Sequence, residues 1–466
     1  MTLTTGTPAR PLRVAIIGAG PTGFYVADHV FQNAQVVAEV DLIDRLPTPY
    51  GLVRLGVAPD HQKIKFVTTA FDKVAANPRF RFYGGVEFGK DVTLADLREH
   101  YHQIVYCTGA QTDRRMGIPG EDLAGSHPAT EFVAWYNGHP DYRHCEFDLT
   151  QERVAVVGVG NVAVDVVRIL CRTAEELAAT DIADYALETL RHSRVKEVYL
   201  LGRRGPAQAA FTNPEIKELG ELADADITAL PDEVELDDLS RAAVERSEDR
   251  ATRKKVEILR GYAQRPAAGK SRRLVLRFLV SPVELRGDGA GRVAAMRLVR
   301  NELYASSTGA LQPRATDRLE ELQVGLVFRS VGYRGVPLPG VPFNESWGVI
   351  LNDKGRVLDP SSKQPLVGEY TAGWIKRGPT GVIGTNKPDA AETVEMMFED
   401  LEIGAVLQPP ATAAAAEALI RERQPRVVSY ADWLKLNEIE VQRGKAQRRP
   451  RIKFTRVEEM LAALGR

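Results

Sequence analysis

The chain carries two copies of a glycine-rich turn, and each copy follows a short run of apolar residues. Gly18-Ala19-Gly20-Pro21-Thr22-Gly23 comes after the run Leu12 to Ile17, and Gly158-Val159-Gly160-Asn161-Val162-Ala163 comes after Val154 to Val157. Such runs are typical of buried parallel strands, and the G-x-G-x-x-G/A spacing is typical of a strand-to-helix turn that binds a dinucleotide. The chain is therefore predicted to be an α/β protein with two Rossmann-like, three-layer domains. Two dinucleotides on one chain suggest that electrons pass between them.

The first turn has a glycine at each of the three positions where the motif needs one. Gly18 allows the tight turn, Gly20 lets the backbone approach a pyrophosphate, and Gly23 lets the helix pack closely on the strand. The N-terminus of the helix that follows supplies N–H groups and a positive dipole end. A merely glycine-rich turn is the alternative.

A second predicted strand, Val40 to Asp44, ends in an acid a little over 20 residues after the first turn. From this position a carboxylate binds the ribose hydroxyls of a dinucleotide, and its charge disfavours a 2'-phosphate. The alternative is that Asp44 is only a solvated strand end. The acid thus suits NAD or FAD better than NADP.

Two further stretches favour FAD over NAD at the first turn. A proline-punctuated loop, Pro47 to Arg54, is followed by Gly56 to His61, and such a rigid loop can lie along an extended cofactor. The apolar strand Gln103 to Cys107 leads into Thr108-Gly109-Ala110, which is similar to the second short signature of FAD proteins.

The second turn differs from the first at the end of its companion strand. Val198 to Leu201 runs into Gly202-Arg203-Arg204-Gly205-Pro206, with no acid. Two guanidinium groups match a 2'-phosphate, because their planar forks make charge-assisted, bidentate bonds to phosphate oxygens. A solvated basic turn is the alternative. NADP is the predicted second cofactor.

The spacing of these motifs predicts that the NADP domain is inserted into a discontinuous FAD domain. The expected parts are the first half of the FAD domain at 1–111, the NADP domain at 112–330, the second half of the FAD domain at 331–404, and a C-terminal extension at 405–466. The two crossings between the domains offer a place for hinge motion.

The densest special stretch runs from Tyr370 to Asn386 and is predicted to be a strand end, a glycine- and proline-rich loop, and a helix that begins near Pro388. In a flavoprotein, such a loop aims N–H groups at the edge of the ring that becomes negative on reduction. Trp374 would lie beside that ring and exclude water, or it would be a core tryptophan.

Composition limits the remaining possibilities. The length of 466 residues predicts two or three domains, and the net charge of -1 argues against a dedicated nucleic-acid binder. The spacing of Cys107, Cys145 and Cys171 argues against disulfides, a zinc site and a redox dithiol, so we expect no metal and a reducing, cytoplasmic location. Met1 to Arg13 lacks the apolar core of a secretory signal and is expected to be a frayed terminus, and no apolar stretch is long enough to span a bilayer.

Taken together, these motifs identify the chain as resembling the adrenodoxin-reductase type of ferredoxin–NADP reductase, most closely its actinobacterial, FprA-like members. The resemblance covers roughly residues 12 to 400, and its rarest runs are Pro47 to Val53, Gly56 to His61, Gly202 to Pro206, Ala210-Phe211-Thr212 and Gly373 to Asn386. Two departures are the pair Asn213-Pro214, which obscures where the next helix begins, and the region after Asp400.

The resemblance implies a set of cofactor-binding residues. For FAD they are Gly18, Gly20, Pro21, Thr22, Gly23, Asp44, Leu52, Val86, Trp374, Gly381, Val382 and Ile383. For NADP they are Arg114, Val159, Gly160, Asn161, Val162, Arg203, Arg204, Glu215 and Gly381. It also implies that His61, Glu215 and Trp374 lie close to the reacting rings, where alignment matters more than acid or base catalysis.

The activity that the resemblance implies is hydride transfer from NADPH to N5 of FAD, followed by single-electron transfer to a small, acidic iron–sulfur ferredoxin. An acidic partner would dock on a basic face, and the predicted helical segment Arg246 to Arg260 offers Arg250, Arg253, Lys254, Lys255 and Arg260 for it. A merely solvated face is the alternative. We expect a monomer with no transmembrane segment and no nucleic-acid partner.

Three other classes use similar motifs. A disulfide reductase needs a dithiol near the flavin, and the three cysteines are not suitably paired. A flavin monooxygenase-like enzyme and an FAD- and NADPH-binding electron-transfer subunit of a larger complex stay open as alternatives. Rapid oxygen-dependent product formation would favour the monooxygenase, and a stable heteromeric complex would favour the subunit.

Overall fold

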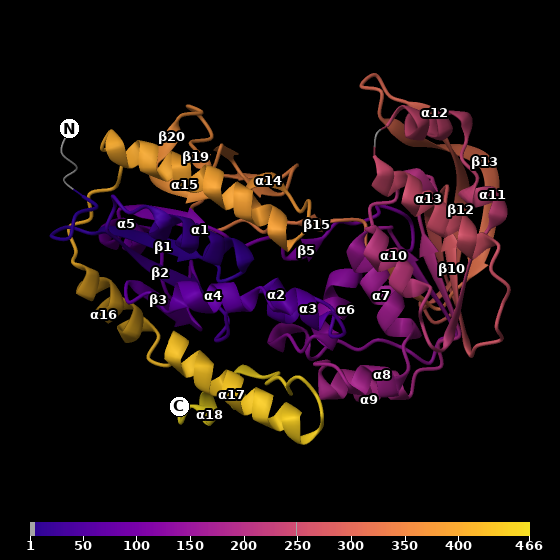
Figure 1. Ribbon diagram of the computed structural model, residues 1–466, viewed down its shortest axis with the longest axis horizontal. Coiled ribbons are helices and arrows are strands. Elements are labelled where there is room, and N and C mark those ends of the chain that lie inside the picture. Colours follow the sequence, from indigo (N-terminus) through magenta and orange to yellow (C-terminus); the bar gives the residue numbers. More distant parts are fainter. Residues whose placement is uncertain (1–4, 248) are drawn as a thin grey trace. The chain divides into compact units, whose positions relative to one another are not determined.

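The computed structural model describes residues 5–247 and 249–466 and divides the chain into two compact units. The first unit consists of residues 1–112 and 333–466, and the second consists of residues 113–332. Figure 1 shows this division by colour, since both the indigo and the orange-to-yellow segments belong to the first unit. At the crossings, the short strands β5 (Thr112–Asp113) and β15 (Tyr333–Arg334) pair with each other.

The first unit is built on a seven-stranded sheet in the order β18-β19-β20-β4-β1-β2-β3. The five strands from β20 to β3 are parallel, and β18 and β19 add an antiparallel edge. The strands of this sheet are β1 (Leu12–Ile17), β2 (Ala38–Asp44), β3 (Phe80–Gly84), β4 (Gln103–Tyr106), β18 (Asn352–Asp353), β19 (Arg356–Leu358) and β20 (Pro365–Thr371). A separate hairpin joins β16 (Phe343–Asn344) to β17 (Val349–Ile350).

Both faces of this sheet are covered, because alternate residues of β1 enter two different cores. Val14 and Ile16 face a core that includes Phe24 and Met397, whereas Ala15 and Ile17 face the other core. The helices of the unit are α1 (Pro21–Gln32), α2 (Leu52–Leu55), α3 (Gln62–Lys65), α4 (Thr68–Ala75), α5 (Leu94–His100), α14 (Trp374–Arg377), α15 (Asn386–Glu402), α16 (Ala413–Arg423), α17 (Tyr430–Ala446) and α18 (Val457–Ala463).

The described part of the N-terminal segment is packed, so the expectation of a frayed terminus up to Arg13 is wrong there. The side chain of Thr5 is buried, Gly6 N donates to Arg10 O at 2.8 Å, and Val37 N donates to Gly6 O at 2.8 Å. These bonds attach the segment that precedes β1 to the residue before β2. Residues 1–4 of the expected leader lie outside the described residues.

The second unit contains a six-stranded, all-parallel sheet in the order β6-β14-β7-β8-β10-β9. Its strands are β6 (Ser126–Pro128), β7 (Arg153–Val157), β8 (Glu197–Leu201), β9 (Ala225–Ala229), β10 (Arg272–Arg277) and β14 (Leu326–Arg329). Its helices are α6 (Ala129–Tyr136), α7 (Asn161–Cys171), α8 (Ala174–Ala178), α9 (Asp184–Arg191), α10 (Asn213–Leu219), α11 (Pro231–Val234), α12 (Asp238–Arg246) and α13 (Arg250–Ala263).

The two faces of the second sheet are covered differently. One face packs against helices, with Val156 and Leu200 in a core that includes α7 and α13 residues. The other face packs against an antiparallel sheet of β11 (Val280–Gly287), β12 (Val293–Ala305) and β13 (Leu311–Gln323), whose Met296 and Leu298 join Val157 in a second core. The unit therefore has three layers, as predicted, but one outer layer is a sheet.

Candidate functional site

The first glycine-rich turn joins β1 to α1, and the steric surroundings of its three glycines differ. Gly18 has a φ of 108°, and a Cβ there would lie 2.6 Å from Cys107 O. At Gly23 a Cβ would lie 2.2 Å from Gly18 O, whereas at Gly20 a Cβ would meet no atom within 4 Å. The open space at Gly20, beside the uncapped N-terminus of α1, fits a pyrophosphate.

Asp44 lies at the end of β2, and it is a structured carboxylate rather than a solvated one. One oxygen accepts a hydrogen bond from Ala19 N at 2.7 Å, and the other accepts one from Leu46 N at 2.9 Å. Burial raises the pKa of this carboxyl, and the two N–H donors oppose that rise. The carboxylate is thereby fixed beside the first turn, which is the position that ribose recognition requires.

The loop after β2 is attached to the first turn through its backbone. Tyr50 N donates to Ala19 O at 2.7 Å, Tyr50 has a φ of 82°, and a Cβ at Gly51 would lie 2.9 Å from Gly20 Cα. Leu52 follows at the start of α2 with 43% of its surface exposed. Val86, also expected to contact FAD, is buried, and its N–H donates to Asp44 O at 2.9 Å.

The C-terminal helix α17 contacts this same loop, which the sequence analysis missed. The guanidinium of Arg54 pairs with the fully buried carboxylate of Glu440, with one bond of 2.8 Å. Lys453 Nζ donates to Arg54 O at 3.2 Å, and Trp433 lies edge-on to Tyr50 at 5.7 Å between ring centroids. Arg451 of the basic stretch 445–453 also approaches Glu440, at 3.3 Å. Arg54 and Glu440 lie 386 residues apart, so no local pattern predicts their pairing.

The loop after β20 carries Trp374 at the start of α14. Its indole is half-buried rather than part of the core, Nε1 donates to Thr380 O at 3.2 Å, and the ring lies 5.5 Å from that of Tyr333. The Arg377 guanidinium donates to Thr380 O and to Asn386 Oδ1, each at 2.8 Å.

Beyond Thr380, the loop presents the last three residues expected to contact FAD. Gly381 has a φ of 79°, Val382 is 51% exposed, and Ile383 is partly buried against the core of the first unit. The next helix, α15, begins at Asn386, close to the predicted start at Pro388.

The second glycine-rich turn joins β7 to α7 and repeats the geometry of the first. Gly158 has a φ of 129°, and a Cβ there would lie 2.1 Å from Ser330 O, whereas a Cβ at Gly160 would meet no atom within 4 Å. Ala163 takes the third position and is fully buried. The open space at Gly160 again fits a pyrophosphate.

The second turn is bound to the run Ala210-Phe211-Thr212. The N–H groups of Ala210 and Phe211 both donate to Val159 O at 2.9 Å, and Thr212 N donates to Asn161 Oδ1 at 2.9 Å. Val162 packs against the helical core of the unit. Val159 and Asn161 are thus fixed by hydrogen bonds to the segment that leads into α10, one through its backbone and the other through its side chain.

Arg203 and Arg204 follow β8 and carry charge without an acidic partner. Arg203 is exposed, Arg204 is half-buried, and neither guanidinium forms an ion pair within the described residues. Burial lowers the pKa of Arg204, and the positive charge of Arg203 lowers it further. Two adjacent cations without a counterion fit a phosphate dianion. Arg114 is also exposed, and its backbone N–H donates to Gly332 O at 2.9 Å.

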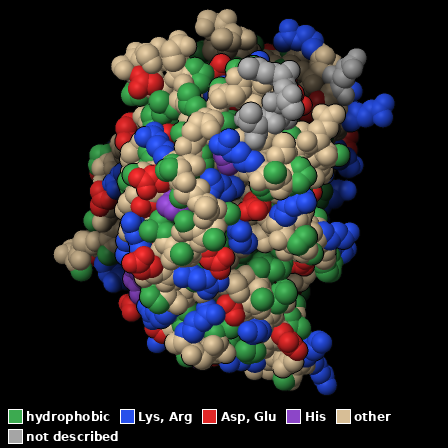
Figure 2. Space-filling view, turned by 90° about the vertical axis from the view of Figure 1, so that its left-hand side faces the viewer, with side chains coloured by type: hydrophobic (Ala, Val, Ile, Leu, Met, Phe, Trp, Pro, Cys, Tyr) green, Lys and Arg blue, Asp and Glu red, His purple; other side chains and the backbone are tan. Residues whose placement is uncertain are grey.

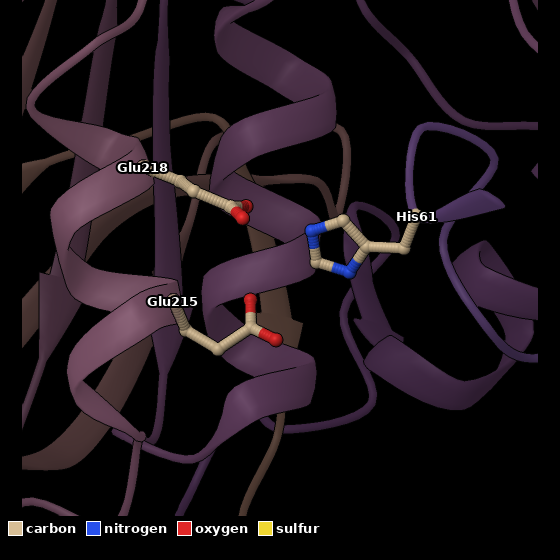
Figure 3. A group of neighbouring side chains, drawn as sticks. All are labelled: His61, Glu215 and Glu218. Atoms are coloured by element: carbon tan, nitrogen blue, oxygen red, sulfur yellow. The ribbon is translucent and has the colours of Figure 1, made fainter. Parts of the chain in front are cut away.

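Glu215 lies in the first turn of α10, one turn before Glu218, and both carboxylates extend from the same side of the helix (Figure 3). Asn213 begins the helix, and Pro214 occupies its first turn, where the missing N–H costs nothing, so the uncertainty about this helix start is resolved. The fully buried Arg168 of α7 holds the Glu215 carboxylate at 3.2 Å and that of Asp165 at 2.6 Å.

Arg168 is a second residue that sequence reasoning missed, because an arginine inside an apolar helix pattern carries no motif. His61, also labelled in Figure 3, belongs to the first unit. It precedes α3, where its N–H donates to Ala58 O at 3.0 Å.

The basic segment Arg246 to Arg260 is not one helix, which corrects the expectation. The helix α12 ends at Arg246 and α13 begins at Arg250, while residue 248 lies outside the described residues. Several of its cations have local partners: Arg253 donates to Ser247 O at 2.7 Å, Lys254 pairs with Glu257 at 2.9 Å and Arg260 pairs with Glu235 at 3.0 Å.

The cysteines do not form a redox dithiol. All three are free thiols, Cys107 and Cys171 are buried, and burial raises the pKa of Cys171 to about 12. Among the described residues, no helix is both long enough and apolar enough to span a membrane.

Comparison with known proteins gives consistent relatives. The model of the pyridine nucleotide-disulphide oxidoreductase family matches residues 12–204. A probable ferredoxin/ferredoxin–NADP reductase of Mycobacterium tuberculosis is 46% identical over 97% of this chain and 76% of its own length. The mitochondrial NADPH:adrenodoxin oxidoreductase of Arabidopsis thaliana is 40% identical over 98% of this chain and 96% of its own.

Among solved structures, FprA of Mycobacterium tuberculosis in complex with NADPH matches with a TM-score of 0.92 and 44% identity, over 98% of this chain and 100% of that one. Matches this long extend well past Asp400. The expectation that similarity ends near that residue is therefore wrong, and the C-terminal helices are shared with these relatives.

Proposed function

Since the chain belongs to the family of NADPH-ferredoxin reductases of the FprA and adrenodoxin oxidoreductase type, we propose that it uses FAD to transfer electrons from NADPH to a ferredoxin. The observation that carries this proposal is the difference between the two turns, one ending in a fixed carboxylate and the other in two unpaired guanidinium groups. These ends suit FAD and NADP respectively.

The first unit would bind FAD. Gly18, Gly20, Pro21, Thr22 and Gly23 would hold the pyrophosphate at the N-terminus of α1, and Asp44 would accept hydrogen bonds from ribose hydroxyls. Leu52, Val86, Trp374, Gly381, Val382 and Ile383 would surround the rest of the cofactor. Bound FAD supplies an acceptor that takes two electrons from a nicotinamide and passes them on one at a time.

The second unit would bind NADPH. Val159, Gly160, Asn161 and Val162 would contact the pyrophosphate, while Arg203 and Arg204 would hold the 2'-phosphate by charge-assisted bonds. Arg114 and Gly381 complete the proposed set. Because no acid among the described residues pairs with the two arginines, the ligand need not displace such an ion pair before it binds.

His61, Glu215 and Trp374 would serve the reaction by alignment. The carboxylate of Glu215 is held in place by Arg168, and the indole of Trp374 is held in place by its hydrogen bond to Thr380 O. Hydride transfer needs the nicotinamide carbon that donates and the flavin N5 that accepts at a fixed separation, so rigid surroundings contribute more than a general acid would.

The ferredoxin partner is proposed to be a small, acidic iron–sulfur protein, and the reductase is proposed to act as a cytoplasmic monomer. On the face drawn in Figure 2, basic and acidic side chains are interspersed, so that face offers no patch of one sign. The exposed arginines and lysines of α13 are the proposed docking surface for the ferredoxin. Docking there would weaken as ionic strength rises.

Anaerobic stopped-flow absorbance tests the proposal. The purified protein is mixed with NADPH or NADH, and bleaching of the flavin band is followed for wild type and for Arg203→Ala/Arg204→Ala. We expect fast reduction by NADPH that the double variant slows by about a hundredfold or more, with NADH little changed, because two charge-assisted contacts are lost. A protein without flavin, or equal rates with both nucleotides in both proteins, would overturn the proposal.

A further inference from the structure

The turn that carries Arg203 and Arg204 is fixed through its backbone. Gly202 N donates to Arg277 O at 2.8 Å, and Val280 N donates back to Gly202 O at 3.0 Å. Leu279 N donates to Arg204 O at 3.1 Å. The three partner residues lie where β10 ends and β11 begins. The turn is therefore supported at the start of the antiparallel sheet.

The carbonyl of Arg203 is held by a side chain instead. Asn301 Nδ2 donates to Arg203 O at 2.8 Å and to Ser281 Oγ at 2.8 Å. Asn301 is only 8% exposed, and its own N–H donates to Leu279 O at 2.7 Å. One amide group therefore spans from the centre of β12 to the arginine turn and to β11.

The pairing of β12 with β13 is irregular next to Asn301. It shifts between Val299, opposite Leu319, and Asn301, opposite Ala315, so the extra residues lie on β13. Such bulges are frequent beside functional sites. Leu279, which accepts the Asn301 N–H, has a φ of 55°, which is unusual for a residue other than glycine.

We propose that Asn301 is a specificity-determining positioning residue, which fixes the Arg203 carbonyl and so keeps both guanidinium groups aimed at the 2'-phosphate. The proposal rests on the proposed binding of NADPH at Arg203 and Arg204. Two adjacent cations repel each other, and Arg203 is exposed, so the turn needs a constraint from outside to hold them together. The side-chain amide supplies it without adding a charge that would repel the phosphate.

The test measures binding of two ligands that differ only in the 2'-phosphate. Adenosine 2',5'-bisphosphate and 5'-AMP are titrated calorimetrically into wild type, Asn301→Leu and Ser281→Ala, all as flavin-loaded full chains. We expect Asn301→Leu to bind the bisphosphate about fivefold more weakly, as the loss of one buried hydrogen bond implies, with 5'-AMP affinity unchanged. Leucine keeps the volume of the side chain and adds no charge.

Ser281→Ala is the matched control, because it removes the other partner of the same amide and leaves the bond to Arg203 O. Its affinity for the bisphosphate should stay within about twofold of wild type, even if its melting temperature falls as much as that of Asn301→Leu. Equal losses in both variants, or a loss for both ligands, would show a general structural role and overturn the proposal. Should Asn301→Leu not fold, Asn301→Ala takes its place under the same criteria.

Arg203→Ala/Arg204→Ala separates this inference from the function on which it rests. If the double variant loses the bisphosphate preference while Asn301→Leu keeps it, the positioning role is wrong and NADPH recognition stands. If the double variant binds both ligands as wild type does, the phosphate site itself is wrong.

Discussion

At Gly18 and at Gly158 the backbone has the same left-handed conformation, and in both places a Cβ would collide with the carbonyl of a residue at the end of a neighbouring strand. Gly20 and Gly160 both face open space. The turns differ at the third position, Gly23 or Ala163, and at the end of the following strand, where β2 ends in Asp44 and β8 runs into Arg203 and Arg204. In the proposed function, the shared geometry would hold a pyrophosphate, and the following strand end would distinguish one dinucleotide from another.

The two strand ends are also supported by different parts of the chain. Asp44 is held by nearby backbone N–H groups, and the loop after it is held by the C-terminal helix α17 through Arg54 and Glu440. The arginine turn is held by the antiparallel sheet through Asn301. In the first unit the outer element therefore supports the loop after the selecting residue, whereas in the second unit it supports the arginine turn itself.

The largest effect is expected from Gly23→Ala. The new Cβ would lie 2.2 Å from Gly18 O and 3.0 Å from Leu42 Cδ1, so α1 would have to move away from the sheet. We expect the free energy of unfolding to fall by about 4–5 kcal/mol and FAD to be lost. Thermal unfolding by circular dichroism and the flavin content of the purified protein measure this.

Gly20→Ala is the control for that prediction. Its Cβ meets no protein atom within 4 Å, so the fold should keep its melting temperature while FAD binding weakens because the methyl group enters the pyrophosphate space. A Gly20→Ala protein that retains wild-type FAD affinity would contradict the placement of the pyrophosphate.

Breaking the buried pair of the first unit is expected to have the next largest effect. Glu440→Gln leaves the Arg54 guanidinium buried without a counterion, which typically costs about 3–5 kcal/mol. Because Arg54 ends the loop that begins at Pro47, FAD affinity should also fall, by about tenfold, measured by fluorescence titration of the apoprotein. The second unit should keep its affinity for adenosine 2',5'-bisphosphate.

Glu369→Gln provides the comparison for Glu440→Gln. Glu369 is equally buried in the same unit and accepts hydrogen bonds from Tyr106 and Arg98, but its partners lie outside the loop after β2. It should lower the melting temperature without weakening FAD binding. Loss of FAD in both variants would mean that α17 contributes only general stability.

The sequence predicts the turns well because their signals are local. Strand, glycine spacing and strand-end charge lie within about 50 residues in each copy, and the structure places the predicted strands at β1, β2, β7 and β8. Local signals failed for the outer layers. No pattern in the stretch from Val280 to Gln323 predicts that it takes the place of a helical layer. An antiparallel sheet packed on one face shows only the usual alternation of apolar and polar residues.

The supporting residues could not be predicted for a related reason. Glu440 lies 386 residues from its partner Arg54, and Asn301 lies 98 residues from Arg203. A buried acid or amide in a sequence looks like a surface one until the fold supplies its partner. Arg168 is the same case, since only the packing of α7 against α10 explains why an arginine is fully buried there.

Asp44→Asn should have an intermediate effect. Asparagine keeps the shape but turns one acceptor oxygen into an NH2 group, which then faces an N–H donor of Ala19 or Leu46. We expect FAD affinity to fall by about thirtyfold, as the loss of charge-assisted hydrogen bonds implies, with NADPH specificity unchanged.

The same carboxylate predicts a pH dependence. Burial raises the pKa of Asp44, so it takes up a proton at a higher pH than an ordinary aspartate does. Ribose hydroxyls donate to the ionised form, so FAD affinity should be greatest above this pKa and fall as the pH decreases through it. Asp44→Asn should lack that part of the pH profile, and an unchanged profile would argue against a ribose contact.

The smallest effect is expected at Ala163, where the second turn departs from the first. Its methyl group is fully buried, whereas a Cβ at the matching position of the first turn, Gly23, would lie 2.2 Å from Gly18 O. Ala163→Gly should therefore destabilise the second unit by only about 1 kcal/mol, through lost helix propensity and lost packing, and leave NADPH binding within twofold. Chemical denaturation and NADPH titration measure the two quantities. If the Ala163→Gly variant instead bound NADPH much more tightly, the methyl group of Ala163 would be limiting how closely α7 packs on the sheet. The third position would then matter in both turns for the same reason.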